Sequence, residues 1–207
     1  PEVGFAYSDA AIWDDTFVPY NVNHGWTHYP YKFRGEILTT MRTWEPSSHS
    51  LGFIWYAPDH VRSWRKDIYH QIGGHKEDLS ICDDHELMIR TYMVTKMHHI
   101  KKPLYIYRVT GDNTWLERND KIQTETKRLF NENAYALAER DADLRGLLKV
   151  DIGGGLFPRP GYMTIDQEGA DVSWDLNLGI PLEDNSVGVL NASHIIEHLR
   201  DPIRTMR

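Results

Sequence analysis

The segment from Lys149 to Asp166 constrains the fold more than any other part of the sequence. A short apolar run that carries one acid, Asp151, leads into three consecutive glycines, and a second short apolar run ends in Asp166. Glycines at the end of a strand let the backbone approach a ligand closely, and an acid after the next strand accepts hydrogen bonds from ribose hydroxyls. We therefore expect a nucleoside-binding α/β domain of parallel strands to begin here, with only about forty residues following Asp166.

The spacing within this segment argues against a dinucleotide-binding domain. The dinucleotide fingerprint G-x-G-x-x-G is not satisfied, because Pro158 stands where the third glycine belongs. Only residues 152–163 separate the two apolar runs, which barely reaches the minimum for a parallel crossover, and that stretch holds two prolines. We predict a loop there in place of a full helix, and a cofactor site more open than usual.

Composition excludes several classes of protein. At 207 residues the chain suggests one or two domains, and its net charge of -7 argues against nonspecific binding to nucleic acid. It holds no run of eighteen apolar residues, so no membrane span is visible. Cys82 is the only cysteine, which rules out an intrachain disulfide and a cysteine-rich zinc site and favours a reducing, cytoplasmic compartment.

Hydrophobic periodicity predicts the elements of the first part of the chain. Apolar and aromatic runs bounded by turn residues indicate strands, and apolar residues at intervals of three and four indicate helices. The predicted elements are a strand at Val3–Tyr7, an irregular aromatic segment at Trp13–Trp44, a buried strand at Leu51–Ala57, a helix at Pro58–Gln71, a helix at Asp83–Lys96, a strand at Pro103–Val109, and two helices within Ile122–Leu148 with a break near Asp141.

Aromatic residues gather in the first part of the chain, between Tyr7 and Trp64, and the totals of seven tryptophans and eleven tyrosines are unusual. Their flat rings stack on sugars or fill a core. Because large aromatic side chains usually bury, we favour the core for Trp26, Trp44 and Trp55.

Two adjacent acids, Asp83 and Asp84, open a predicted helix about ten residues after a Gly-Gly turn. One interpretation is structural, because acids in a first turn cap a helix and complement its dipole. The other is functional: one carboxylate faces a cleft and removes a proton from an acceptor hydroxyl. Spacing alone favours the structural interpretation and leaves the functional one open.

A resemblance to a known family bears on this choice. The segment Ile72–Arg90, with Gly-Gly, a short spacer and acid-Asp-x-x-Leu, resembles the C-terminal half of family 2, GT-A-type inverting glycosyltransferases. The strand at Pro103–Arg108 resembles the one that closes their catalytic core, and the resemblance covers roughly residues 1–115. The site residues that it implies are Asp84 as catalytic base, Asp83 beside it, and Arg62, Trp64 and Arg65 as substrate-binding residues.

The sequence departs from that family in its metal motif. The family's Asp-x-Asp belongs to an N-terminal half that would lie before Pro1, and we place Asp9 just beyond that motif. Many relatives also carry a metal-binding histidine after the closing strand, and none stands near Val109 and Thr110. We therefore expect a nucleotide sugar with Mg or Mn only in the complete parent protein, and no metal site in this chain.

The second part, about residues 147–207, resembles the type 11 group of class I S-adenosylmethionine-dependent methyltransferases. A glycine-rich first motif, an acid ending the second strand and an Asp-Leu pair stand in the order of that family. Its segment corresponding to His194, Glu197 and His198 starts a helix and binds no metal. The cofactor-binding residues that the resemblance implies are Asp151, Gly153, Gly154, Gly155, Asp166, Gln167, Asp175, Leu176 and Asn191.

These patterns predict an α/β chain in which a partial GT-A-type unit precedes a partial Rossmann-like methyltransferase sheet. The expected domains are residues 1–118, a helical connector at 119–146, and residues 147–207. We expect a fragment of a bifunctional transferase for glycan modification, which uses a nucleotide-sugar donor, a glycan acceptor and S-adenosylmethionine and is catalytically weak in isolation. The alternative is an inactive fragment or a non-enzymatic module for binding or assembly. The apolar surface of two incomplete domains would favour a homo-oligomer.

Overall fold

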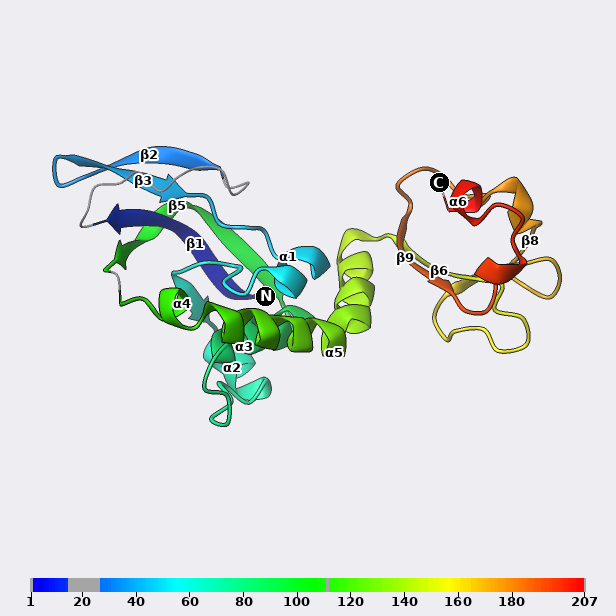
Figure 1. Ribbon diagram of the computed structural model, residues 1–207, viewed down its shortest axis with the longest axis horizontal. Helices are drawn as coiled ribbons and strands as arrows, with labels where there is room; N and C mark the ends of the chain where they lie inside the picture. The colour runs from blue at the N-terminus through cyan, green and yellow to red at the C-terminus, as the bar shows by residue number, and fades with distance from the viewer. Residues whose placement is uncertain (1, 15–26, 111, 207) are drawn as a thin grey trace. The chain divides into compact units, whose positions relative to one another are not determined.

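The computed structural model describes residues 2–14, 27–110 and 112–206. The chain divides into two compact units, unit 1 at Pro1–Leu137 and unit 2 at Ala138–Arg207 (Figure 1). The helix α5, Asn119–Arg145, runs through the boundary between them. None of the helices in the described ranges combines the length and apolar character that a membrane crossing needs.

Unit 1 is built on a five-stranded sheet whose centre is the long strand β1. The strand order is β2-β3-β1-β4, and β5 pairs with β1 in parallel, whereas the other pairs are antiparallel. The predicted strands at 3–7 and 103–109 lie within longer ones. The strands are β1 (Val3–Asp14), β2 (His28–Phe33), β3 (Glu36–Met41), β4 (Arg62–Trp64) and β5 (Lys96–Val109).

The prediction of an irregular segment at Trp13–Trp44 is wrong for its described part, because β2 and β3 form an antiparallel hairpin there. The two residues that join them, Arg34 and Gly35, both have positive φ, 51° and 92°. A two-residue hairpin turn of type I′ requires positive φ at both positions, and glycine adopts it easily. Gly35 is therefore the residue of the sequence that signals this turn. Residues 15–26, with Trp26, lie outside the described residues.

Two predicted elements on either side of residue 58 are wrong. Leu51–Ala57 is not a strand, because a capping box formed by Ser47 and Ser50 starts the helix α1 (Ser48–Phe53). Of the predicted helix at 58–71, only residues 66–71 are helical, as α2. Residues 62–64 form the strand β4, which pairs with β1. The helix predicted at 83–96 is confirmed as α3. The remaining helices of unit 1 are α2 (Lys66–Gln71), α3 (Asp83–Val94) and α4 (Thr114–Glu117).

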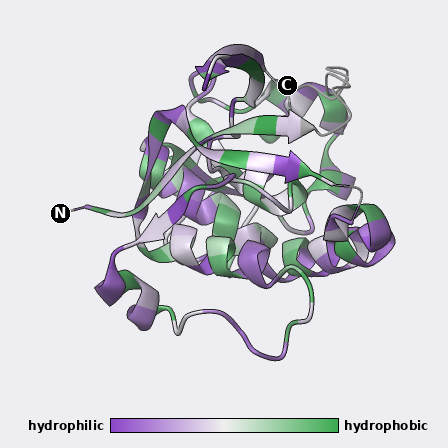
Figure 2. Cartoon of the chain, turned by 90° about the vertical axis from the view of Figure 1, so that its left-hand side faces the viewer, coloured by the Kyte–Doolittle hydropathy of each residue, from purple (hydrophilic) through white to green (hydrophobic). Residues whose placement is uncertain are grey.

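The core of unit 1 joins the central strand to α3. Phe5 and Tyr7 of β1 are buried, as are Leu87, Met88 and Tyr92 of α3. Burying one such side chain stabilises the fold by roughly 1.5–3 kcal/mol. Figure 2 shows that the strands and helices carry both hydrophobic residues, in green, and hydrophilic residues, in purple. Because α3 buries these side chains in the core, the two acids of its first turn are held in a fixed place.

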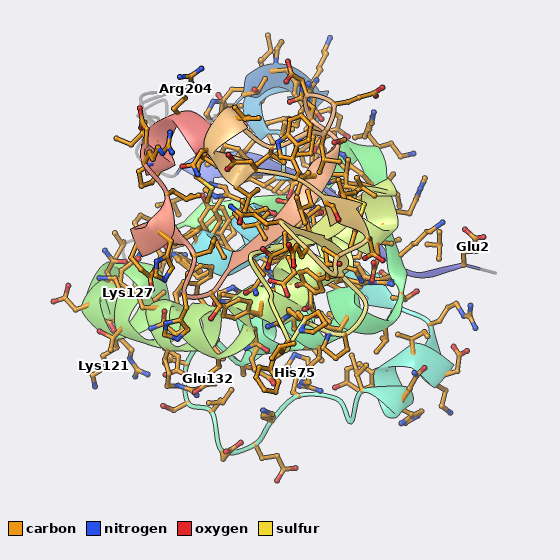
Figure 3. All side chains as sticks on the ribbon, turned by 90° about the vertical axis from the view of Figure 1, so that its right-hand side faces the viewer. Glu2, His75, Lys121, Lys127, Glu132 and Arg204 are labelled. Carbon is orange, nitrogen blue, oxygen red and sulfur yellow. The ribbon has the colours of Figure 1, made fainter. Side chains whose placement is uncertain are left out.

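The predicted break near Asp141 is wrong, because α5 is one helix of 27 residues. Ion pairs between residues three and four apart support it, including Arg128 with Glu125 and Arg145 with Asp141. Its apolar residues Ile122, Leu129 and Leu137 are buried at intervals near seven. Its charged side chains point outward, as the labelled Lys121, Lys127 and Glu132 do in Figure 3.

Unit 2 is a four-stranded parallel sheet with the order β8-β7-β6-β9. Val150, Ile152 and Ile165 from its strands are fully buried and pack with Leu176 and Leu199. The loop predicted between the first two strands is confirmed, since no helix forms between β6 and β7. The elements are β6 (Leu148–Ile152), β7 (Met163–Asp166), β8 (Val172–Ser173), η1 (Leu176–Leu178), β9 (Val187–Ala192), η2 (Ile196–His198) and α6 (Pro202–Thr205).

The fold class is therefore α/β, with a mostly antiparallel sheet in unit 1 and a parallel sheet in unit 2.

Candidate functional sites

Unit 1 contains a cavity of about 1100 Å³ beside the first turn of α3. Asp83 and Asp84 both line it, together with Trp44, Trp55 and other residues that come from β1, β5, α4, the start of α5 and the loops around residues 54–60. The structure thus brings the two predicted acids to a concave surface large enough for a small-molecule ligand.

Asp84 is held at this cavity by a buried arginine. Arg62 donates from Nη1 to Asp84 Oδ2 at 2.6 Å, and its side chain is 5% exposed against 35% for that of Asp84. Arg62 also donates from Nε to the carbonyl of Pro58 and from Nη2 to the carbonyl of Tyr56, both at 2.9 Å. The predicted substrate-binding residue Arg62 therefore has its guanidinium engaged within the protein, where it fixes the orientation of the Asp84 carboxylate.

The other oxygen of Asp84, Oδ1, accepts from the backbone N–H of His85 at 2.9 Å. His85 is itself fully buried, and its Nε2 lies 2.6 Å from the carbonyl oxygen of Leu51. Burial lowers the pKa of His85, which favours the neutral ring. The acids stand in the first turn of α3 and also line the cavity, so the structural and the functional interpretations both stay open.

Trp64 and Arg65 lie elsewhere. Trp64 packs edge-on against Phe5 with ring centroids 4.8 Å apart, and its Nε1 donates to Thr91 Oγ1 at 2.9 Å. Arg65 pairs with Asp67 at the surface. Neither residue lines the cavity, so the structure brings only Asp83 and Asp84 of the predicted unit 1 residues to it, with Arg62 behind them.

The cavity also gathers residues that sequence reasoning missed. Asp59 is 8% exposed, and its Oδ1 lies 3.1 Å from Nδ1 of His60. On β5 and the segment after it, the hydroxyl of Tyr107 accepts hydrogen bonds from Asn113 Nδ2 at 3.0 Å and from Trp115 Nε1 at 3.1 Å. Burial raises the pKa of Tyr107. No local motif marks these residues, because Asp59 and His60 lie about fifty residues from Tyr107 in the sequence and meet it only in the folded chain.

Asp9, a residue of β1, is buried and has several partners. It accepts from Tyr29 Oη at 2.6 Å and from the backbone N–H of Thr43 at 3.1 Å, and Nε2 of His99 lies 2.8 Å from its Oδ1. No group of three or more His, Cys, Asp or Glu side chains among the described residues is suited to hold a metal ion. The partners of Asp9 instead account for a buried carboxylate by hydrogen bonding.

In unit 2 the predicted residues meet at the carboxyl edge of the sheet. Asp151, only 2% exposed, accepts from the backbone N–H of Arg159 at 2.7 Å and from Asn191 Nδ2 at 2.7 Å. Its two oxygens thus tie the glycine-rich loop to β6 and β9. Asn191, a predicted cofactor-binding residue, is thus one of the two hydrogen-bond donors to the Asp151 carboxylate.

The three glycines have distinct roles. Gly153 has φ of +66°, and a Cβ there would lie 2.5 Å from the side chain of Ile195. A Cβ on Gly154 would lie 2.7 Å from Asp151 Oδ2. Gly155 has φ of +53° and faces open space. The first two positions therefore need glycine for packing, and the third offers exposed backbone at the edge.

Asp166 joins the ends of the first two strands. Its Oδ2 accepts from the backbone N–H of Gly155 at 3.0 Å, and its Oδ1 accepts from the backbone N–H of Gln167 at 2.7 Å. Each oxygen keeps a further lone pair, because a carboxylate accepts about four hydrogen bonds in all. The side chain is half-buried and that of Gln167 is exposed.

Asp175 and Leu176 follow β8 at the same edge. Asp175 caps the 3₁₀ helix η1 by accepting from Asn177, whose backbone N–H lies 3.0 Å away. This bond holds the pKa of Asp175 below its ordinary value. Leu176 is 4% exposed and belongs to the core of unit 2, so its side chain serves packing.

The chain matches no protein-family model, no curated protein and no solved structure.

Proposed function

We propose that the chain belongs to a bifunctional transferase, in which unit 2 binds S-adenosylmethionine for methyl transfer and unit 1 takes part in inverting glycosyl transfer. The observation that carries the first assignment is the parallel order β8-β7-β6-β9, with the glycine loop after β6 and Asp166 after β7. The chain order reverses between β6 and β9, and open α/β sheets bind ligands at such a switch point, outside the carboxyl ends of the strands.

The residues at this edge fit a nucleoside cofactor. Asp166 has lone pairs left for ribose hydroxyls. A Cβ built on Gly155 would meet nothing within 4 Å, so the loop is open to a ligand on that side. Asp151 is only 2% exposed and accepts from Arg159 and Asn191, so it orients the loop without facing the ligand. When bound, S-adenosylmethionine supplies the methyl group from its sulfonium, and the residues of this chain bind and orient it.

Calorimetry with S-adenosylmethionine tests this assignment. We expect saturable binding to the chain and its loss in Asp166→Ala. Asp171→Ala is the matched control, because Asp171 accepts from Thr164 at the start of β7 and therefore at the opposite edge of the same sheet. Thermal melts establish that both variants fold. Absence of binding to the unaltered chain would contradict the assignment and favour a non-enzymatic module.

The second activity rests on a separate observation: Asp84 lines the cavity of unit 1 and is fixed there by Arg62. In the proposed step the Asp84 carboxylate accepts the proton of an acceptor hydroxyl as its oxygen attacks the anomeric carbon of a nucleotide sugar. The bond from that carbon to the nucleoside diphosphate breaks, and inversion results.

Turnover of the polypeptide with its flanking sequence tests the role of Asp84. We expect Asp84→Asn to abolish glycosyl transfer and to leave donor binding intact. Asp67→Asn, which alters an exposed acid paired with Arg65 outside the cavity, should leave the rate unchanged. Persistent turnover in Asp84→Asn would show that another group is the base.

A further inference from the structure

The lining of the unit 1 cavity combines aromatic rings with carboxylates. We propose that it selects an acceptor saccharide that carries a free, protonated amino group. The proposal rests on the assignment of this cavity to glycosyl transfer and adds the class of acceptor. Five aromatic residues and four aspartates line the cavity: Trp44, Trp55, Tyr56, Tyr107 and Trp115, with Asp59, Asp83, Asp84 and Asp112.

The aromatic side chains suit a flat sugar ring. Trp115 and Asn113 both donate to the Tyr107 hydroxyl, which makes this part of the lining rigid. Trp55 and Tyr56 meet edge to face with centroids 4.9 Å apart. Trp44 and Trp55, which we predicted to lie in the core, are only partly buried and line the cavity. Rigid rings at a cavity can stack on the apolar face of a sugar.

Trp44 adds an unsatisfied donor. Its Nε1 is buried with no hydrogen-bond partner among the described residues, although the residue lines the cavity. A buried donor without a partner is disfavoured. Among the described residues, no acceptor competes with a ligand oxygen, such as a sugar hydroxyl, for this N–H.

The charges of the lining are unbalanced. Asp84 is paired with Arg62, and Asp59 contacts His60. Asp83 and Asp112, in contrast, have no ion pair with any described residue. Arg118 is the one arginine or lysine of the described lining. The dipole of α3 contributes about half a positive charge at its first turn, which is too little to offset two carboxylates.

This excess of negative charge distinguishes among acceptors. A phosphorylated or carboxylated saccharide would be repelled, and a neutral one would be bound by stacking and hydrogen bonds alone. An ammonium group is attracted both by the carboxylates and by the faces of the aromatic rings. The same rings therefore serve all saccharides, whereas Asp83 and Asp112 favour the cationic ones.

A matched pair of ligands tests the proposal: a β-1,4-linked glucosamine trisaccharide and the same trisaccharide with every amine N-acetylated. Binding is measured by calorimetry near neutral pH with no donor present, so the result does not depend on turnover. We expect the free-amine form to bind about tenfold more tightly at low salt, and the difference to shrink as salt screens the charges. Equal affinities, or tighter binding of the acetylated form, would overturn the proposal.

Variants separate the contribution of the carboxylates to binding from that of the aromatic rings. Asp112→Asn should reduce the preference for the amine without weakening the acetylated form, Trp115→Ala should weaken both, and the control Asp67→Asn should change neither. If neither trisaccharide binds, the amino-sugar proposal fails. Turnover that depends on Asp84 with a different acceptor would still support glycosyl transfer, so the two failures are distinguishable.

Discussion

The two candidate sites are ordered by different kinds of contact. In unit 1 one side chain holds another, since the buried Arg62 fixes Asp84 at the wall of a cavity. In unit 2 carboxylates hold the backbone, since Asp151 and Asp166 accept from N–H groups of the glycine-rich loop. A site of the first kind depends on the identity of its side-chain pair, and one of the second kind depends on the backbone dihedral angles that glycine permits.

The largest expected loss of stability follows from breaking the ion pair between Arg62 and Asp84 in unit 1. Arg62→Met removes the partner of Asp84 and of the carbonyls of Pro58 and Tyr56. Breaking a buried ion pair costs about 3–5 kcal/mol, and because the Asp84 side chain is 35% exposed we expect about 3 kcal/mol. Urea unfolding followed by tryptophan fluorescence measures this, since six of the seven tryptophans belong to unit 1.

The control for this prediction is Arg65→Met. Arg65 also pairs with an aspartate, Asp67, but both side chains are well exposed, at 38% and 61%. An exposed pair contributes less than about 1 kcal/mol. If the two variants lose equal stability, then Arg62 does not act as a buried anchor and the distinction between the two sites weakens.

The next largest effect concerns the backbone of unit 2. Gly153→Ala would place a Cβ 2.5 Å from Ile195 at φ of +66°, whereas Gly155→Ala has φ of +53° and open space. Left-handed backbone costs roughly 1–2 kcal/mol for a residue with a Cβ, and the clash at Gly153 adds about another 1 kcal/mol. We expect Gly153→Ala to lose about 1 kcal/mol more than Gly155→Ala in hydrogen-exchange protection of β6 and β7. Equal losses would show that Ile195 yields to the added methyl.

A smaller difference in stability should distinguish the removal of Asp151 from the removal of Asp166 in unit 2. Asp151→Ala leaves the N–H of Arg159 and the amide of Asn191 without their buried acceptor, which costs about 2 kcal/mol. Asp166 is half-buried and its donors can turn to water, so Asp166→Ala should cost under about 1 kcal/mol. Hydrogen exchange of unit 2 compares them. A greater loss for Asp166→Ala would show that the exposed acid carries the structure of the loop.

Local patterns predicted unit 2 better than unit 1, for a physical reason. In unit 2 the strands, the loop and the acids follow one another within a few tens of residues, so short-range spacing determines which residues meet. In unit 1 the cavity forms where β1 pairs with β5, about ninety residues away. Tyr107 of β5, Trp115 of α4 and Asp59 of a loop all line this cavity, and periodicity alone does not reveal that they meet.

Local competition accounts for the other errors in unit 1. The apolar run from Leu51 has the composition of a strand, but the Ser47 capping box, together with the contact of Leu51 with His85, stabilises a helix. The sequence predicts that Arg62 and Trp64 belong to a helix and bind substrate. Their polar atoms instead find partners inside the protein, at Asp84 and at Thr91. A charged or aromatic residue beside a functional motif is therefore ambiguous until its partner is known.

The smallest expected effect compares the acid sensitivity of the two units. In unit 1 burial raises the pKa of Glu86, but hydrogen bonds from Arg90 and Lys76 outweigh it and hold the pKa below the ordinary value of 4.5. In unit 2 hydrogen bonds from Tyr162 and Arg159 lower the pKa of Glu139. Because the pKa of each group is lower in the folded chain, the unfolded chain binds more protons below about pH 4.5. The stability that each group contributes is therefore present above that pH, and it is lost as the pH falls through the folded-state pKa.

Glu86→Gln and Glu139→Gln should therefore reduce stability near neutral pH and flatten its decline in acid. The Glu86 side chain is 7% exposed and that of Glu139 32%, so the change should be about 1 kcal/mol for the first and less for the second. Tryptophan fluorescence in urea from about pH 6 down to about pH 3.5 follows unit 1, and hydrogen exchange follows unit 2. If the stability of Glu86→Gln declines in acid as steeply as that of the unaltered chain, the acid sensitivity of unit 1 belongs to other carboxylates.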